Sequence, residues 1–146
     1  MTTSKVSVEQ FQEIVGAGLP QLDGWNMKVE HLGFGEGTIL LPYQGSFLRP
    51  GGTISGPTMM ALGDLALYLA VLSTIGPEPM AVTTSLNTNF LHFPAAGDLR
   101  AKVRVLKAGR RLVYGDVEIF ALAGDPELCV THITGTYSVP STKTVK

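Results

Sequence analysis

The stretch that decides the fold runs from Ser55 to Leu72 and reads SGPTMMALGDLALYLAVL, with Asp64 as its only charged residue. Proline is favoured in the first turn of a helix, because its missing N–H has no partner there. We therefore expect a helix that starts at Pro57, with Ser55 or Gly56 as its N-cap. The run is too short and too interrupted to span a bilayer. A helix that is apolar on nearly every side is instead buried in a core.

The segments around this helix predict an antiparallel sheet. A first short helix is expected over about Val8 to Val15, because Ser7 and Gln10 have the spacing of a capping box. Six strand-like segments are expected at residues 27–32, 37–42, 82–93, 98–106, 112–121 and 128–139. The last four are joined by short turns, which favour antiparallel neighbours. The pattern is that of an α+β fold with one buried helix packed on an antiparallel sheet.

The length of 146 residues predicts one domain that spans the whole chain. Its core is expected over about residues 25–140. Residues 1–24 form an N-terminal helix and loop, and residues 141–146 a frayed tail.

Charged residues make up only 16% of the chain, against about 25% in an ordinary soluble domain. The deficit indicates burial in an oligomer, contact with a membrane, or a surface rich in glycine, serine and threonine. The 17 glycines account for part of it. The one long apolar run carries Asp64, which argues against a membrane. Burial between subunits therefore remains the favoured explanation.

Composition also excludes several kinds of site. The net charge of −1 leaves no basic footprint for nucleic acid. The single cysteine, Cys129, excludes a disulfide framework and is expected to be an inert core thiol. His31, His92 and His132 lack metal-ligand spacing, so no metal is predicted. The N-terminus lacks the apolar segment of a signal peptide, which favours a cytoplasmic protein.

Two features of the buried helix suggest a catalytic or binding site. Burying a carboxylate such as Asp64 costs free energy unless it is paired. It is therefore either a structural group bonded to a threonine or to the backbone, or a functional group. Gly56 places a bare backbone N–H at the helix N-terminus, where free donors and the helix dipole favour an oxyanion. Pro57 has no N–H to donate.

The stretch from Ser55 to Asp64 resembles the central-helix motif H-G-G-x-x-x-x-L-x-D of the PaaI-like hotdog-fold acyl-CoA thioesterases. Gly56, Leu62 and Asp64 match that motif with the right spacing. The stretch VTTSLNTNFL at residues 82–91 resembles the next strand of this family. The stretch LKAGRR at residues 106–111 resembles the following strand and turn. The likeness covers about residues 25–140 and points to the 4-hydroxybenzoyl-CoA thioesterase-like superfamily.

The resemblance implies a hotdog fold, in which an antiparallel sheet wraps around one long helix. It implies a homodimer, or a homotetramer built as a dimer of dimers, with active sites between subunits. The implied reaction hydrolyses an acyl-CoA thioester, with coenzyme A as part of the substrate and no separate cofactor. Asp64 would act as general base or nucleophile, and the Gly56 N–H would polarise the thioester carbonyl. Thr83 would help to hold the water or the acid.

The motif also has departures. Ser55 stands where the family has histidine, Pro57 stands where it has the second glycine, and Arg49 stands where relatives often carry an amide. Arg49 can donate to a carbonyl or pair with a carboxylate such as Asp64. We expect Arg49, Ser55 and Pro57 to border the substrate.

Further substrate contacts are expected from two other segments. Lys107, Arg110 and Arg111 could hold the phosphates of coenzyme A, or form an ordinary solvated turn. Asn89 could line the acyl pocket, or belong to a packed strand.

Two other functions remain open at this point. The same cleft could bind an acyl-CoA or an acyl carrier without turnover. A hotdog dehydratase is less favoured, because that chemistry commonly uses a histidine near the helix, where this chain has Ser55.

Overall fold

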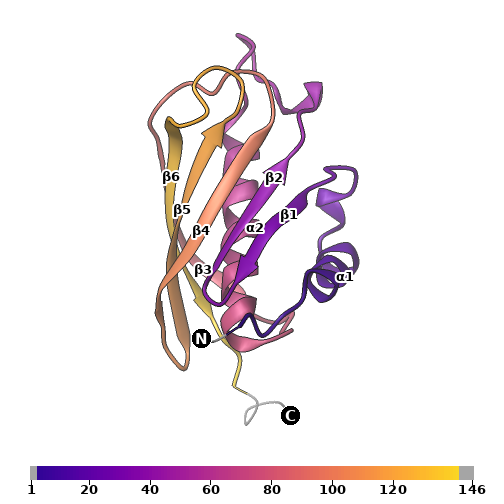
Figure 1. Cartoon of the computed structure of the whole chain (residues 1–146), viewed down its shortest axis with the longest axis vertical. Coiled ribbons are helices and arrows are strands. Elements are labelled where there is room, and N and C mark those ends of the chain that lie inside the picture. Colours follow the sequence, from indigo (N-terminus) through magenta and orange to yellow (C-terminus); the bar gives the residue numbers. More distant parts are fainter. Residues whose placement is uncertain (1–2, 142–146) are drawn as a thin grey trace.

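A computed structural model describes residues 3–141 of the chain. One sheet curves around one long helix, and a shorter helix lies beside the sheet (Figure 1). The helices are α1 (Val8–Gly18) and α2 (Gly56–Ile75), with 3-10 turns η1 (Pro20–Leu22) and η2 (Gly45–Phe47). The strands are β1 (Lys28–Gly33), β2 (Glu36–Leu41), β3 (Val82–Phe90), β4 (Leu99–Ala108), β5 (Leu112–Ala121) and β6 (Cys129–Ser138). The expected α+β hotdog architecture is confirmed.

The strand order is β1-β2-β4-β5-β6-β3, and every neighbouring pair is antiparallel. The expectation that β3 and β4 are neighbours is wrong, because β3 pairs with β6 at the far edge of the sheet. The segment between the two strands, residues 91–98, crosses the end of the sheet (Figure 1). Eight residues can span about 26 Å, and three strand spacings need only about 14 Å.

Helix α2 starts where the sequence predicts and continues three residues past the predicted end at Leu72. Ser55 is the N-cap and accepts a hydrogen bond from the Thr58 N–H, and the helix ends before Gly76.

Among the described residues, α2 alone is long and apolar enough to cross a membrane by length and composition. The predicted run was shorter than this helix of 20 residues, so length alone does not exclude that α2 spans a membrane. Burial argues against a membrane span, because 78% of the most apolar window of α2 lies inside the fold.

A pair of glycines lets α2 approach the sheet closely. Gly115 of β5 and Gly135 of β6 face each other in register, and Leu67 of α2 packs against both. A methyl group on Gly135 would lie 2.6 Å from the Leu67 Cδ1 atom. A methyl group on Gly115 would lie 2.6 Å from the Arg104 carbonyl oxygen. The helix therefore sits at a depth that only glycine permits on these strands.

Helix α1 begins with the predicted capping box. The Ser7 side chain accepts from the Gln10 N–H, and the Gln10 side chain accepts from the Ser7 N–H. The helix continues to Gly18, three residues past the predicted end at Val15. It packs beside β1 (Figure 1).

Aromatic contacts fasten the N-terminal region to the rest of the fold. Phe11 of α1 contacts Tyr68 of α2, and Tyr68 stacks on Tyr137 of β6 with ring centroids 5.8 Å apart. Trp25 packs edge-on against Phe47 of η2, with centroids 4.9 Å apart. The Phe47 carbonyl accepts from the N–H of Ser55, the N-cap of α2. These contacts tie residues 8–25 both to the middle of α2 and to the segment that leads to its start.

Candidate functional site

Two hydroxyl groups bind one oxygen of the Asp64 carboxylate. Thr83 of β3 donates to Oδ1 at 2.8 Å, and the Tyr137 hydroxyl of β6 donates to the same atom at 2.7 Å. The Tyr137 hydroxyl also lies 3.0 Å from the Asp64 carbonyl oxygen. No residue in the range 3–141 donates to Oδ2. Three elements thus fix the carboxylate and leave one oxygen available for a ligand.

Tyr137 is the site residue that the sequence analysis missed. Its side chain is buried, and burial, together with the neighbouring charge of Asp64, raises the pKa of the phenol far above its ordinary value. Tyr137 therefore stays protonated and acts as a donor. The signal was present in β6, because the alternation of Ile133, Gly135 and Tyr137 places this ring on the inner face. A buried tyrosine hydroxyl needs a partner, and Asp64 supplies it.

The Asp64 carboxylate opens into a cleft of about 350 Å³, close to the lower limit of ligand pockets. Polar groups gather around Asp64, namely the hydroxyls of Thr83 and Tyr137. Most other walls are apolar and come from α1, residues 19–22, α2, and the segment that leads into β3 together with the first residue of that strand. They include Ile14, Leu19, Leu22, Leu65, Ala81 and Val82. The cleft therefore has mostly apolar walls and one carboxylate that is held in a fixed orientation.

The N-terminus of α2 presents one amide to a ligand. Pro57 has no N–H, and the Thr58 N–H is bonded to the Ser55 hydroxyl oxygen at 3.3 Å. No described residue accepts a hydrogen bond from the Gly56 N–H. The Phe90 ring lies only 3.1 Å from the position that a Cβ on Gly56 would take. Gly56 therefore offers a donor at the positive end of the helix, in a place where a side chain would press on the Phe90 ring.

The Gly56 amide and the Asp64 carboxylate belong to one helix but lie far apart. Eight residues separate them, which is about 12 Å along the helix axis. Both groups of one chain therefore cannot act on a single thioester carbonyl.

The other predicted site residues divide between the two ends of the molecule. Arg49 is exposed in the loop before α2. Within the described chain Arg49 forms no ion pair with Asp64. Lys107, Arg110 and Arg111 are exposed at the β4–β5 turn, at the opposite end of α2 (Figure 1). Asp64 lies between these two ends, so the structure brings none of the four cations to it.

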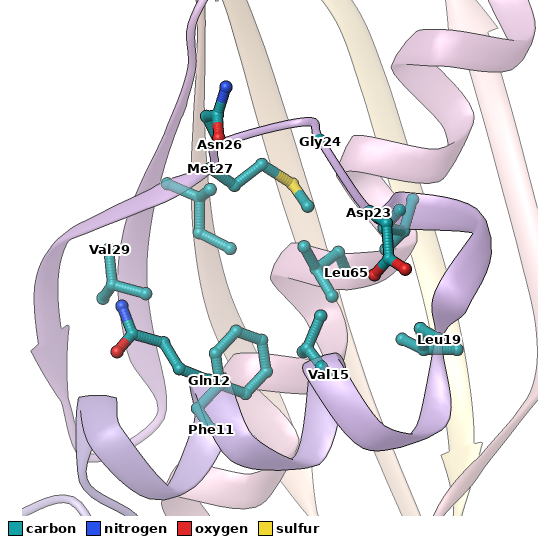
Figure 2. A pocket seen from close by; sticks show the side chains of 13 residues that line it. Phe11, Gln12, Val15, Leu19, Asp23, Gly24, Asn26, Met27, Val29 and Leu65 are labelled. Carbon is teal, nitrogen blue, oxygen red and sulfur yellow. The ribbon is translucent and has the colours of Figure 1, made fainter.

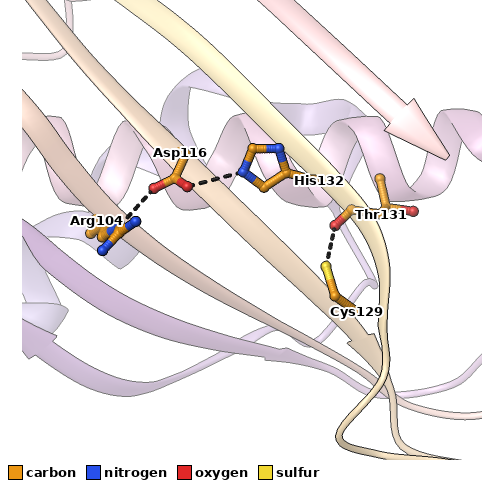
Figure 3. A network of polar contacts seen from close by, with 5 residues as sticks. All are labelled: Arg104, Asp116, Cys129, Thr131 and His132. Carbon is orange, nitrogen blue, oxygen red and sulfur yellow. Dashed lines mark hydrogen bonds and ion pairs between the residues drawn. The ribbon is translucent and has the colours of Figure 1, made fainter. Parts of the chain in front are cut away.

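Asn89 is not brought to the Asp64 cleft. It is exposed and pairs in register with His132, whose side chain lies on the sheet face turned away from α2. On that face Asp116 contacts Arg104 at 3.0 Å and His132 at 3.0 Å (Figure 3). The expected contact of Asn89 with an acyl pocket inside one chain is therefore not formed.

Cys129 lies near this outer face, where its Sγ atom contacts the Thr131 carbonyl oxygen at 3.3 Å (Figure 3). Burial raises the pKa of its thiol. The side chain is only half-buried and lies outside the core cluster, so the expected core position of this cysteine is wrong. Within residues 3–141, no group of three or more histidine, cysteine, aspartate or glutamate side chains could hold a metal ion.

The model of the thioesterase superfamily matches residues 51–127, which include α2 and Asp64. A candidate thioesterase from a Silicibacter species is 36% identical, covers 94% of both chains and superposes with a TM-score of 0.81. A variant of the phenylacetic acid degradation protein PaaI from Thermus thermophilus is 28% identical. The match covers 83% of this chain and 99% of that one, with a TM-score of 0.71. A candidate esterase from Thermoplasma volcanium is 31% identical over 120 residues, which are 80% of this chain and 87% of the relative.

Three observations point to the same family. They are the order of elements, the fixed carboxylate on the central helix, and these similarities. The chain belongs to the thioesterase superfamily, as a PaaI-like protein with the hotdog fold, and its general class is that of the thioester hydrolases.

Proposed function

We propose that this protein hydrolyses acyl-CoA thioesters, with Asp64 as the group that activates water or attacks the carbonyl carbon. The observation that carries the proposal is the Asp64 carboxylate, which lines a largely apolar cleft and whose Oδ1 is held by Thr83 and Tyr137, while no residue in the range 3–141 donates to Oδ2. Two hydrogen bonds fix the direction in which the free oxygen meets a ligand. Such fixed geometry lowers the entropic part of the reaction barrier.

In the first version of the reaction, Asp64 Oδ2 removes a proton from water as the oxygen of that water attacks the carbonyl carbon. The carbonyl oxygen becomes an oxyanion, which a Gly56 N–H stabilises at a helix N-terminus. The tetrahedral intermediate then collapses, the C–S bond breaks, and the proton passes from Asp64 to the leaving thiolate. In the second version Oδ2 attacks the carbon itself, the C–S bond breaks, and coenzyme A leaves as a thiolate that takes a proton from solvent. Water then cleaves the mixed anhydride, which frees the acid and restores the Asp64 carboxylate.

We propose that the complete site needs two chains. Gly56 and Asp64 of one chain are about 12 Å apart along α2, so they cannot both reach the same thioester. A second copy of the chain must therefore supply one of the two groups. The edge strand β3 offers the surface for this copy. Seven of its nine residues are exposed, and one edge of its backbone is unpaired by the sheet. Five of the twelve large apolar side chains that are exposed in the described chain lie at positions 80, 82, 90, 91 and 93.

The exposed cations are proposed to meet the phosphates of coenzyme A. Lys107, Arg110 and Arg111 form one basic group at the β4–β5 turn, and Arg49 is a second site at the start of α2. Arginine binds phosphate oxygens with two parallel N–H groups.

The test is release of coenzyme A from a panel of acyl-CoA esters by the wild type and by Asp64→Asn. We expect Asp64→Asn to lower kcat by at least about 100-fold, because an amide can neither take the proton nor attack. Asp125→Asn removes the same charge from an exposed turn far from the cleft and should leave kcat unchanged. Equal rates for Asp64→Asn and the wild type would refute the role of Asp64. A wild type that binds acyl-CoA without releasing coenzyme A would favour the binding module instead.

A further inference from the structure

A second cavity lies beneath α1 (Figure 2), and three of its lining residues also line the Asp64 cleft. Its volume is about 210 Å³, and α1, the turn after η1, β1 and α2 enclose it. Leu19, Leu22 and Leu65 line this cavity and also line the cleft. Leu65 directly follows Asp64 in the sequence. The boundary between the two spaces is therefore made of three leucines, one of them next to the carboxylate.

The cavity is apolar inside and polar at its rim. Figure 2 shows Phe11, Val15, Met27 and Leu65 around one shared space. The polar lining residues Gln12, Asp23 and Asn26 are all exposed, so they mark the mouth. A polar ligand would leave its groups unpaired among the inner walls. The inner space instead suits methylene and methyl groups.

We propose that this cavity beneath α1 receives the far end of a straight aliphatic acyl chain whose thioester lies at Asp64. The inference rests on the proposed function and names its substrate class. To reach the cavity, the flexible chain would pass between Leu19, Leu22 and Leu65, the three residues that line both spaces. A rigid aromatic acyl group would remain in the 350 Å³ cleft. Helix α1 would then set the longest chain that the protein accepts.

Two adjacent residues of α1 separate the roles of the two spaces. Ile14 lines the Asp64 cleft and not the second cavity, whereas Val15 lines the second cavity and not the cleft. A change at Val15 thus alters the end of the chain and leaves the walls beside Asp64 in place. Glu13 is exposed, lies on the same helix and lines neither space. It provides a matched control for the added bulk.

The experiment measures the dissociation constants of S-alkyl-CoA thioethers of increasing chain length, which bind without being hydrolysed. For the wild type we expect affinity to rise about fourfold per methylene until the second cavity is full. Val15→Trp fills that cavity, so the rise should stop at a shorter chain. The longest ligand should lose at least tenfold in affinity, and the shortest should stay within twofold. Glu13→Trp should reproduce the wild-type series.

A second variant covers the case in which Val15→Trp fails to fold, as judged by thermal unfolding. Val15→Ala enlarges the cavity and should move the end of the rise to a longer chain, with the shortest ligand unchanged. If neither variant changes the dependence on chain length, or if all ligands weaken equally, the proposal is overturned. The failure of the proposed function is separate, because it is shown by missing release of coenzyme A and not by thioether binding.

Discussion

Asp64 Oδ1 accepts two hydrogen bonds, and the two donors are not equivalent. Thr83 is exposed on an edge strand, whereas Tyr137 is buried and stacked on Tyr68. The raised pKa of Tyr137 keeps its proton in place over the whole physiological range. Tyr137 is therefore the more rigid of the two, and it holds Asp64 through both the side chain and the backbone carbonyl.

Removing only the Tyr137 hydroxyl should reduce turnover without removing the binding surface. Tyr137→Phe keeps the stack on Tyr68 and deletes one hydrogen bond to the carboxylate, which is worth about 1.5–3 kcal/mol. We expect kcat to fall roughly tenfold to 100-fold, with KM within twofold of the wild type. Steady-state kinetics check this, and Tyr114→Phe, on an exposed ring, is the control. A rise in KM with unchanged kcat would contradict a positioning role.

The same tyrosine predicts a loss of stability at alkaline pH. Above about pH 10, the ordinary pKa of tyrosine, the unfolded chain releases the Tyr137 proton while the folded chain keeps it. The unfolded state then binds fewer protons, so the free energy of unfolding decreases as pH rises, by up to about 1.4 kcal/mol per pH unit. Urea unfolding between pH 9 and 11 measures the slope. Tyr137→Phe should reduce the slope, because only the contribution of groups such as Tyr68, whose pKa is also raised by burial, then remains. Tyr43→Phe, an exposed position, should leave the slope unchanged.

At the scale of elements, the depth of α2 against the sheet depends on the facing glycines of β5 and β6. Leu67 fills the space that a side chain on Gly135 would need, and it lies 3.2 Å from the position that a Cβ on Gly115 would take. These glycines are visible in the sequence of the predicted strands, but a glycine in a strand can have several structural roles. Only the register of β5 with β6 shows that the two positions face each other.

Gly135→Ala should lower the free energy of unfolding by about 1–3 kcal/mol, because the added methyl overlaps Leu67 in a packed core. The measurement is the urea midpoint at a fixed protein concentration. Gly45→Ala is the matched control, since nothing lies within 4 Å of its Cβ position. That control should stay within about 0.5 kcal/mol of the wild type. A Gly135→Ala protein as stable as the wild type would show that α2 can shift away from the sheet.

The elements themselves were predictable where the signal is local. The start of α2 follows from Ser55 and Pro57, and the start of α1 follows from the capping box at Ser7. The place of β3 at the edge of the sheet was not predictable from the short segment that joins it to β4. The pairing of a strand depends on all strands of the sheet and not only on the next one in sequence. Tyr137 was missed for the same reason. Its partner Asp64 is 73 residues away and meets it only in the folded chain.

At the scale of the whole molecule, the exposed apolar side chains gather along and after β3. This surface predicts a mass of at least twice 15.5 kDa in light scattering at micromolar concentration. Leu91→Lys places a charge beside the β3 edge and should shift the mass toward that of one chain. Leu106→Lys is the control at the β4–β5 turn, because Leu106 is 50% exposed and Leu91 is 52% exposed. A wild type that remains monomeric would argue against a site shared between two chains.

The packing of Trp25 on Phe47 has a practical consequence. Trp25 is the only tryptophan of the chain, and its neighbours in sequence, Gly24 and Asn26, line the cavity beneath α1. Its ring partner Phe47 lies in the segment that leads to the start of α2. One indole therefore lies next to the proposed chain-length cavity and to the loop before the proposed oxyanion donor. Its fluorescence emission is a built-in optical signal for ligand entry, readable without any attached label.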